Sequence, residues 1–161
     1  MKKNPYRRKY LFGLSLIILL TDQLSKIWAN EYLSKGIPTD FIPNMLRFRL
    51  VNNTGAAFSI LSNSTILLAI LSLVVSLSLT FWIMNFRPKT IIMGTAFAIL
   101  LGGCLGNGID RWRLGYVIDF IEIVPFSFPI FNIADISINI AVILLLIDTL
   151  TSRNKNTWKK E

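Results

Sequence analysis

Two aspartates, Asp119 and Asp135, lie at the edges of apolar stretches in a chain of 161 residues that contains no histidine. An ionised aspartate near the centre of a bilayer costs about 3 kcal/mol even on lenient insertion scales, so acidic groups beside lipid usually serve a function. The absence of histidine excludes Ser-His-Asp and Cys-His catalysis in their usual forms. Any chemistry on this chain is therefore expected to use carboxyl groups.

Two carboxyl groups brought together in a partly desolvated place cannot both ionise easily, so they share one proton. The ionised group can remove a proton from water while the protonated group polarises a carbonyl oxygen, as in the aspartic proteases. This chemistry needs neither a metal ion nor a cofactor, and we expect none. Asp119 and Asp135 are the candidate catalytic pair, on the condition that the fold brings them together.

Structural interpretations of the same acidic residues also exist. Asn132 followed by Asp135 fits a helix N-cap with an acid at the third helical position, which approximates a capping box. Asp119 fits a solvated loop residue, and the adjacent Asp110 and Arg111 fit a structural ion pair. These interpretations stay open at the level of the sequence.

The composition is that of an integral membrane protein. Hydrophobic residues make up 53% of the chain and charged residues only 16%, whereas soluble domains usually carry about 25% charged residues. The mean hydropathy is +0.55. The net charge of +8 comes mostly from short basic flanks beside apolar segments, as the positive-inside rule predicts, so we exclude nucleic acid as a partner. The basic residues of the two flanks are Lys2, Lys3, Arg7, Arg8 and Lys9 at the start and Arg153, Lys155, Lys159 and Lys160 at the end.

Four apolar segments reach the length of about 20 residues that crosses a bilayer. The predicted spans are 10–29, 65–86, 90–109 and 133–150, joined by outer loops 30–64 and 110–132, in one membrane domain covering 1–161. Both basic termini and the basic turn 87–89 then fall on one side, which the positive-inside rule makes cytoplasmic. The candidate carboxyl groups fall at the opposite, extracytoplasmic face.

The first span also has a competing interpretation as a cleaved secretory signal peptide. Residues 21–26, Thr-Asp-Gln-Leu-Ser-Lys, stand where a cleavage site of small residues would be needed, so we disfavour it. Asp22 and Lys26 within that segment are spaced i,i+4 with the acid first, which is the favoured order for a pair on one helix face.

Small residues characterise the third span and predict close helix packing in lipid. The lone cysteine, Cys104, lies among glycines there and permits no internal disulfide, so we give it a structural role. The small residues are Gly94, Ala96, Ala98, Gly102, Gly103 and Gly106.

The outer loops contain two segments with strand-like patterns. Residues 46–50 alternate apolar and basic side chains, which predicts a short strand with one face on the membrane surface. A turn is expected at 52–55, Asn-Asn-Thr-Gly, and residues 117–123 form a second extended stretch.

Five short motifs, in order along the chain, resemble those of the lipoprotein signal peptidase family, also called signal peptidase II. They are Thr21-Asp22-Gln23-Leu24-Ser25-Lys26, Asn53-Thr54-Gly55-Ala56-Ala57-Phe58-Ser59, Gly106-Asn107 with Asp110-Arg111, Val117-Ile118-Asp119-Phe120 and Phe131-Asn132-Ile133-Ala134-Asp135. Ile118 is a conservative departure from the valine that is commoner in the family. Together the motifs and the four-span layout cover nearly the whole chain.

The resemblance implies an all-α membrane protein with four transmembrane helices and a small extracytoplasmic β-like cradle, the latter matching residues 46–50. It implies an aspartic endopeptidase of the bacterial plasma membrane that cuts diacylglyceryl-modified prolipoproteins before the lipidated cysteine. Asp119 and Asp135 match the family's catalytic pair. Residues that match supporting or substrate-binding positions are Asp22, Asn53, Asn107, Asp110, Arg111 and Asn132. Membrane lipid is the expected surrounding partner, and the chain is expected to act as a monomer.

Three alternative functions remain possible from the residues alone. The acids Asp22, Asp119 and Asp135 suit a relay in a small ion or proton transporter. Asp119 and Asp135, joined by Asp110 and Glu122, suit a carboxylate site for Mg²⁺ or Mn²⁺. The third alternative is a non-catalytic assembly protein.

Overall fold

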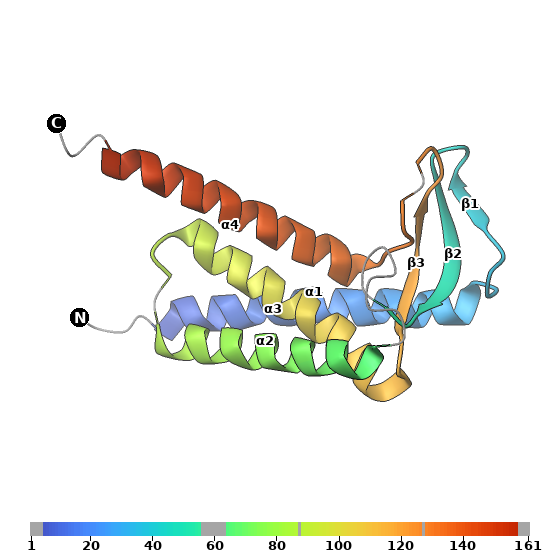
Figure 1. Cartoon of the computed structure of the whole chain (residues 1–161), viewed down its shortest axis with the longest axis horizontal. Helices are drawn as coiled ribbons and strands as arrows, with labels where there is room; N and C mark the ends of the chain where they lie inside the picture. Colours follow the sequence, from blue (N-terminus) through green and yellow to red (C-terminus); the bar gives the residue numbers. More distant parts are fainter. Residues whose placement is uncertain (1–4, 56–63, 87, 127, 158–161) are drawn as a thin grey trace.

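The structure is a computed structural model that describes residues 5–55, 64–86, 88–126 and 128–157. Its elements in chain order are α1 (Pro5–Tyr32), β1 (Thr39–Ile42), β2 (Leu46–Asn53), α2 (Thr65–Asn85), α3 (Ile91–Leu114), β3 (Val117–Ile123) and α4 (Ile133–Thr157). The helices lie alongside one another, the sheet lies at one end of the bundle beside the end of α1, and α1 begins and α4 ends at the other end (Figure 1). We call these the sheet end and the termini end.

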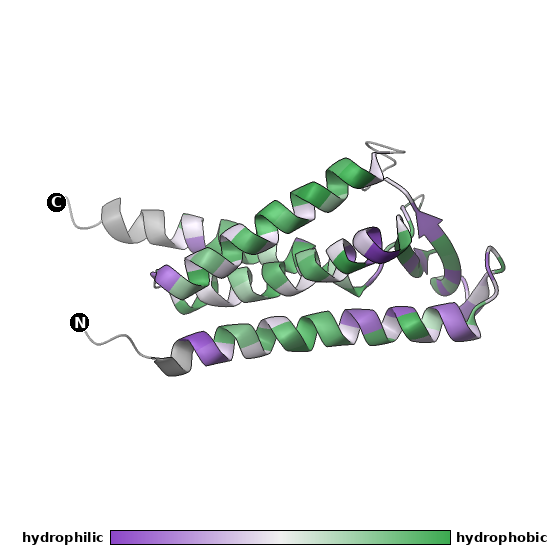
Figure 2. Ribbon diagram, turned by 90° about the horizontal axis from the view of Figure 1, so that it is seen from below, coloured by the Kyte–Doolittle hydropathy of each residue, from purple (hydrophilic) through white to green (hydrophobic). Residues whose placement is uncertain are grey.

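The described residues contain four helices that are long and apolar enough to cross a membrane, as the sequence predicts. Their candidate spans are Arg8–Tyr32, Thr65–Asn85, Ile91–Leu114 and Ile133–Thr151. Hydrophobic residues cover most of each helix, whereas hydrophilic residues gather toward the sheet end (Figure 2). Much of the basic charge expected at the termini, together with Arg87 and the motif residues 56–59, lies outside the described residues.

Helix α3 is longer than predicted, and this corrects one loop boundary. The sequence places the end of the third span at residue 109, whereas α3 continues to Leu114. It ends at Gly115, whose φ of 78° is left-handed and whose N–H donates to the carbonyl of Arg111. Asp110 and Arg111 are therefore helical residues and do not belong to the outer loop 110–132. Their polar side chains ended the apolar pattern before the backbone helix ended.

The small residues of α3 bring its neighbours into close contact. A Cβ atom added to Gly102 would lie 2.7 Å from the carbonyl oxygen of Ser15 and from Cβ of Ile18 on α1. A Cβ atom added to Gly103 would lie 2.9 Å from the carbonyl oxygen of Ala134 on α4. The predicted packing role of small residues is confirmed at these two positions, and α3 makes the most extensive contacts with each of the other three helices.

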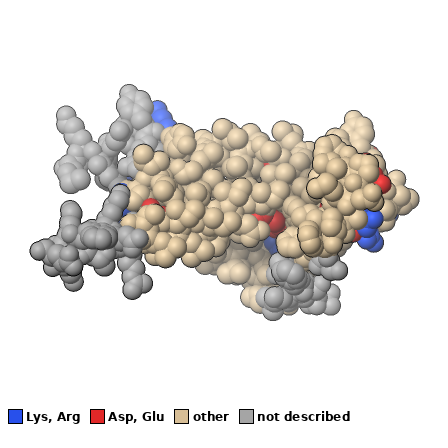
Figure 3. Space-filling view, turned by 90° about the horizontal axis from the view of Figure 1, so that it is seen from above, with Lys and Arg blue, Asp and Glu red and all other residues tan. Residues whose placement is uncertain are grey.

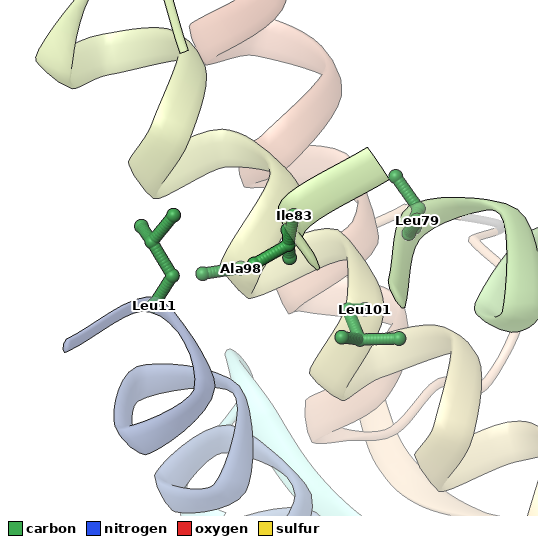
Figure 4. Packing of buried hydrophobic residues seen from close by; sticks show 5 residues of the cluster. All are labelled: Leu11, Leu79, Ile83, Ala98 and Leu101. Atoms are coloured by element: carbon green, nitrogen blue, oxygen red, sulfur yellow. The ribbon is translucent and has the colours of Figure 1, made fainter. Parts of the chain in front are cut away.

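The termini-end half of the bundle is held by an apolar cluster from three helices (Figure 4). Its buried members are Leu11 on α1, Leu79 and Ile83 on α2, and Ala98 and Leu101 on α3. The outward faces of the helices are also apolar, and Ile66 on α2 remains 78% exposed. Charged atoms on the face shown in Figure 3 lie mostly near its two ends. Such surfaces suit a hydrocarbon environment.

The three strands form an antiparallel sheet in the order β1-β2-β3. The strands expected at 46–50 and 117–123 are both present, which confirms the mainly helical fold with a small β-structure. The turn expected at 52–55 starts later, because Asn52 and Asn53 still pair with Ile118 and Val117 of β3. Those pairs extend β2 to the edge of the helix bundle.

The sheet rests on the end of α1 through an apolar cluster. Ile118 and Phe120 of β3 are buried in this cluster with Ala29 of α1 and Leu50 of β2. Successive strand residues point to opposite faces of a sheet. Asp119, between these two apolar residues, is therefore directed away from α1 and toward the start of α4.

Candidate active site

One cavity of about 190 Å³ joins side chains from four separate elements. Its polar lining comes from Asn53 at the end of β2, Asn107 and Arg111 on α3, Asp119 on β3, and Asp135 and Asn139 on α4. Its apolar lining comes from Val117, Phe128, Pro129, Ile130, Phe131 and Ile138. The structure thus brings Asp119 and Asp135 to one cavity, as their candidate role requires.

Asp135 sits in the capping box that its spacing from Asn132 predicts. The backbone N–H of Asp135 donates to Oδ1 of Asn132 over 3.0 Å, and the backbone N–H of Asn132 donates to Oδ2 of Asp135 over 3.2 Å. The second carboxylate oxygen of Asp135 accepts a 2.8 Å hydrogen bond from Nδ2 of Asn107. The structural interpretation of Asp135 is right but incomplete, because the same carboxylate lines the cavity.

Asp119 is buried, with 2% of its surface exposed, so its interpretation as a solvated loop acid is wrong. Its Oδ1 accepts a 2.6 Å hydrogen bond from Nδ2 of Asn132, and its Oδ2 accepts a 2.8 Å hydrogen bond from Nδ2 of Asn53. Each oxygen therefore has a neutral amide donor in a fixed position.

Asn132 connects the two carboxyl groups directly. Its side-chain amide donates to Asp119, and its backbone N–H donates to Asp135. The same amide nitrogen lies 3.1 Å from Oδ1 of Asn107, whose own amide nitrogen donates to Asp135. We call Asp119 and Asp135, with these shared amides, the carboxyl pair.

The surroundings of Asp119 favour its protonated form. Burial raises the pKa of this carboxyl from 3.8 to about 7, and the negative charge of Asp135 adds to the rise. The hydrogen bonds from Asn53 and Asn132 act in the opposite direction but do not cancel the effect. A carboxyl group with this pKa can hold a proton near neutral pH.

Arg111 presents a cation to the same cavity. Its guanidinium donates to the carbonyl oxygen of Gly55 over 3.1 Å, and its buried Nε has no hydrogen-bond partner among the described residues. The predicted ion pair between Arg111 and Asp110 is wrong, because successive residues on a helix point in different directions. Asp110 pairs instead with Lys26 of α1 over 2.9 Å.

Behind the cavity lies an ion cluster formed by Asp22, Lys26 and Asp110. Nζ of Lys26 lies 2.9 Å from Oδ2 of Asp22 and 2.9 Å from Oδ2 of Asp110. Asp22, Lys26 and Asp110 are 0%, 2% and 3% exposed, so the cluster is closed to solvent. The i,i+4 pair predicted for α1 is present, but it belongs to a larger cluster that reaches α3.

Three polar residues of this region were not among the predicted site residues. Lys26 donates to Asn107 over 2.9 Å, Gln23 donates to Asp110 over 3.0 Å, and Asn139 lines the cavity. Asn139 follows Asp135 by one helical turn, so helical spacing was the signal for its position. Gln23 and Lys26 lie in a motif that was recognised, but nothing in the sequence names their partners on α3.

The four acids of the metal-site alternative are not brought together in the described part of the chain. Glu122 lies 2.7 Å from Nε of Arg47 on β2, and that contact lowers the pKa of the glutamate. Asp110 is held by Lys26 in the ion cluster. Asp22 is also unsuited to the transporter relay, because its carboxylate is enclosed by Lys26 and the backbone N–H of Ala134.

Comparison with known proteins gives one consistent result. A family model described as Signal peptidase (SPase) II matches residues 14–151. The lipoprotein signal peptidase of Parasynechococcus marenigrum is 47% identical over 156 residues, covering 97% of this chain and 98% of the relative. The lipoprotein signal peptidase of Acinetobacter baylyi is 44% identical over 155 residues, covering 92% of this chain and 86% of the relative.

A solved structure has the same fold. It is described as a bacterial membrane enzyme determined by the in meso method at 2.3 Å resolution, and it superposes with a TM-score of 0.85. Its sequence is 31% identical, and the match covers 91% of each chain. The family model and the relatives span almost the whole sequence, and this chain therefore belongs to the lipoprotein signal peptidase family, signal peptidase II.

Proposed function

We propose that this protein is a membrane aspartic endopeptidase that removes the signal peptide from diacylglyceryl-modified prolipoproteins, cutting before the lipidated cysteine. Membership of the signal peptidase II family supports the reaction and the substrate class. The observation that carries the chemistry is the cavity lined by both Asp119 and Asp135, with Asn132 bonded to each carboxylate.

In the proposed reaction the carboxyl pair activates a water molecule against the scissile carbonyl. The ionised member removes a proton from the water, and the protonated member donates a hydrogen bond to the carbonyl oxygen. Asp119 is the proposed proton carrier, since burial and the charge of Asp135 raise its pKa to about 7. The proton then passes to the leaving amide nitrogen, so no covalent intermediate is needed.

The amides and the arginine have supporting roles in this proposal. Asn53, Asn107 and Asn132 hold the carboxylate oxygens in fixed orientations, which avoids reorganisation during the reaction. Arg111 binds a carbonyl of the substrate through the buried Nε that has no partner among the described residues. Much of the binding free energy comes from the lipid anchor and the apolar signal segment, which lie away from the cleaved bond.

We infer that the chain forms a single membrane domain, active as a monomer within membrane lipid, with both termini in the cytoplasm. The basic flanks of the sequence support this orientation through the positive-inside rule. The termini end and the sheet end are opposite ends of the bundle (Figure 1), so the cavity then faces the extracytoplasmic interface. A diacylglyceryl group anchored in the outer leaflet would hold the scissile bond at that depth.

Cleavage of a defined lipidated precursor, measured in detergent or vesicles, tests this proposal. Asp119→Asn and Asp135→Asn should each lower kcat at least about 1000-fold, because each removes one member of the acid–base pair. Asp148→Asn is the matched control, since Asp148 lies on α4 as well but bonds to Thr90 at the termini end. Turnover within about tenfold of wild type by either cavity variant would overturn the mechanism.

A further inference from the structure

The ion cluster contacts the backbone of the two segments that carry the carboxyl pair. Oδ1 of Asp22 accepts a 2.8 Å hydrogen bond from the N–H of Ala134, the residue before Asp135. Oδ2 of Asp110 accepts a 3.2 Å hydrogen bond from the N–H of Ile118, the residue before Asp119. Lys26 pairs with both acids of the cluster at 2.9 Å. One ammonium group therefore stabilises both backbone attachments.

Lys26 also determines which way the amide of Asn107 faces. A lysine ammonium group can only donate hydrogen bonds, so the atom of Asn107 that lies 2.9 Å from it must be the oxygen. The amide nitrogen then points to the other side, where it donates to Asp135 over 2.8 Å. Lys26 and Asn107 are 81 residues apart in the sequence, so this contact exists only in the folded chain.

The same oxygen orients the second carboxyl group. Oδ1 of Asn107 accepts a 3.1 Å hydrogen bond from Nδ2 of Asn132, and that nitrogen donates to Asp119 over 2.6 Å. The amide of Asn132 is also oriented by the N–H of Asp135, which donates to its Oδ1, whereas the direction of the Asn107 amide traces back to the cation. The amides are neutral and can rotate by half a turn, whereas the ammonium group cannot become an acceptor.

We propose that Lys26 is a positioning residue of the peptidase, fixing the direction of the Asn107 amide, which donates to Asp135 and accepts from the Asn132 amide that bonds Asp119. This inference rests on the function proposed above. Without the ammonium group, Asn107 can turn its oxygen toward Asp135 and repel the carboxylate. The charged groups surrounding the pair are Asp22 and Lys26 on α1 and Asp110 and Arg111 on α3. Loss of Lys26 should therefore change both the rate and its pH dependence.

Replacing Lys26 alone would leave two unpaired carboxylates in a dry site, so the informative variant is Lys26→Met/Asp22→Asn. It keeps the cluster's formal charge at about −1, as in wild type, and retains a side-chain oxygen for the N–H of Ala134. The reference is Asp22→Asn alone, which keeps the donor to Asn107. Relative to that reference, kcat should fall about 10- to 100-fold with KM within about threefold, because the reacting groups are misplaced while remote binding is unchanged.

The pH profile of kcat/KM for the lipidated precursor is the readout that a merely structural role would not move. We expect the profile of Lys26→Met/Asp22→Asn to be displaced by about 0.5 pH unit or more from that of Lys26→Gln/Asp22→Asn, which carries the same formal charge and keeps a side-chain donor. Equal kcat and an unchanged profile in a folded Lys26→Met/Asp22→Asn variant would overturn the positioning role. Turnover by Asp119→Asn would instead overturn the proposed function, so the two failures are distinguishable.

A second pair of variants covers the case in which the methionine variant does not fold. Lys26→Gln/Asp22→Asn supplies a neutral amide donor that is one bond shorter than lysine, and its kcat should stay within about threefold of Asp22→Asn. A fall of more than about tenfold would overturn the donor-based explanation. Asp148→Asn, in the same helix bundle but at the termini end, should leave kcat and the pH profile unchanged.

Discussion

Two groups of aspartates lie next to each other in this protein and differ in what compensates their charge. In the ion cluster, Asp22 and Asp110 each lie 2.9 Å from the ammonium of Lys26, and the cluster is closed. In the carboxyl pair, the direct hydrogen bonds to Asp119 come from the neutral amides of Asn53 and Asn132, and its carboxylate lines a cavity. Asp119 is as buried as Asp22 and Asp110, whereas Asp135 is half-buried, and Asp119 differs from the ion cluster in its neighbours.

The difference separates a structural role from a chemical role for one residue type. A carboxylate with a close cation is held in place and serves as a fixed acceptor for backbone N–H groups. A carboxylate with only neutral donors and a second acid nearby has a raised pKa, as at Asp119, and can exchange a proton. The two groups therefore differ in whether a cation bonds directly to the carboxylates.

The largest effect on stability should come from breaking the ion cluster. Asp110→Ala removes one partner of Lys26, the acceptor for the N–H of Ile118 and the acceptor for Gln23. Breaking a buried ion pair in this way costs about 3 to 5 kcal/mol, and we expect that loss in unfolding free energy. Reversible unfolding in detergent, followed by circular dichroism, measures it. A loss below about 1 kcal/mol would show that the cluster is not structural.

Removing the charge of Asp119 should have the opposite effect on stability, because it should stabilise the folded protein. The pKa of Asp119 is raised from 3.8 to about 7 in the folded protein, so the folded state binds more protons than the unfolded state between these values. The wild type is therefore destabilised as pH rises through about 7, by at most about 4 kcal/mol. Asp119→Asn avoids this cost.

The melting temperature of Asp119→Asn should accordingly exceed that of the wild type at pH 8, although the variant is inactive. The difference should shrink as the pH falls toward 4, because the wild-type carboxyl is then protonated in both states. Thermal unfolding of both proteins across this range is the measurement. A variant that is less stable than the wild type at pH 8 would contradict the comparison.

An intermediate effect should follow from crowding the ion cluster without changing its charge. A Cβ atom added at Gly106 would lie 2.5 Å from Oδ2 and 3.0 Å from Cγ of Asp22, which is held by Lys26 and Ala134. Gly106→Ala should therefore cost about 1 to 3 kcal/mol in unfolding free energy. Gly13→Ala is the matched control on α1, because nothing lies within 4 Å of its added Cβ.

The control variant Gly13→Ala should gain up to about 1 kcal/mol in unfolding free energy, since alanine is a better helix former than glycine. Unfolding Gly106→Ala and Gly13→Ala in parallel tests both the expected loss and the expected gain in stability. If both were destabilised equally, the loss would reflect the substitution type rather than the contact with Asp22.

The sequence was sufficient for features that depend on local pattern. Apolar length predicted four helices, alternation predicted the strand at 46–50, and the spacing of Asn132 and Asp135 predicted a capping box. The end of α3 was misplaced because apolar length and backbone helix are different properties. The helix continues through the polar side chains until a glycine with φ of 78° ends it.

The partners of the polar side chains depend on tertiary packing and were not predictable in the same way. Residue types identified Asp119 and Asp135 as candidates, but the amide bridge between them requires α3, β3 and α4 to meet. Adjacency suggested that Asp110 pairs with Arg111, whereas the fold brings Lys26 to Asp110 from another helix. No local sequence pattern predicts the orientation of the Asn107 amide, because that orientation depends on Lys26 of another helix.

The smallest effect should come from an acid that is paired outside the membrane-spanning helices. Glu122 on β3 accepts bonds of 2.7 and 2.9 Å from Arg47, but the two side chains are 15% and 29% exposed. Arg47 lowers the pKa of Glu122 below its ordinary 4.5, so the pair stabilises the fold above that pH and stops doing so as the pH falls further.

Glu122→Gln should therefore change the melting temperature at pH 7 by no more than about 3 °C, because water and salt screen exposed pairs. Raising the salt concentration to about 1 M should remove most of that difference, whereas the loss in Asp110→Ala should persist. Thermal unfolding of both variants at low and high salt tests this. A salt-insensitive loss at Glu122 as large as that at Asp110 would mean that exposure does not govern the strength of these pairs. At the sheet surface the solvent beside Arg47 and Glu122 supplies part of the compensation that Lys26 supplies to Asp22 and Asp110 within the helix bundle.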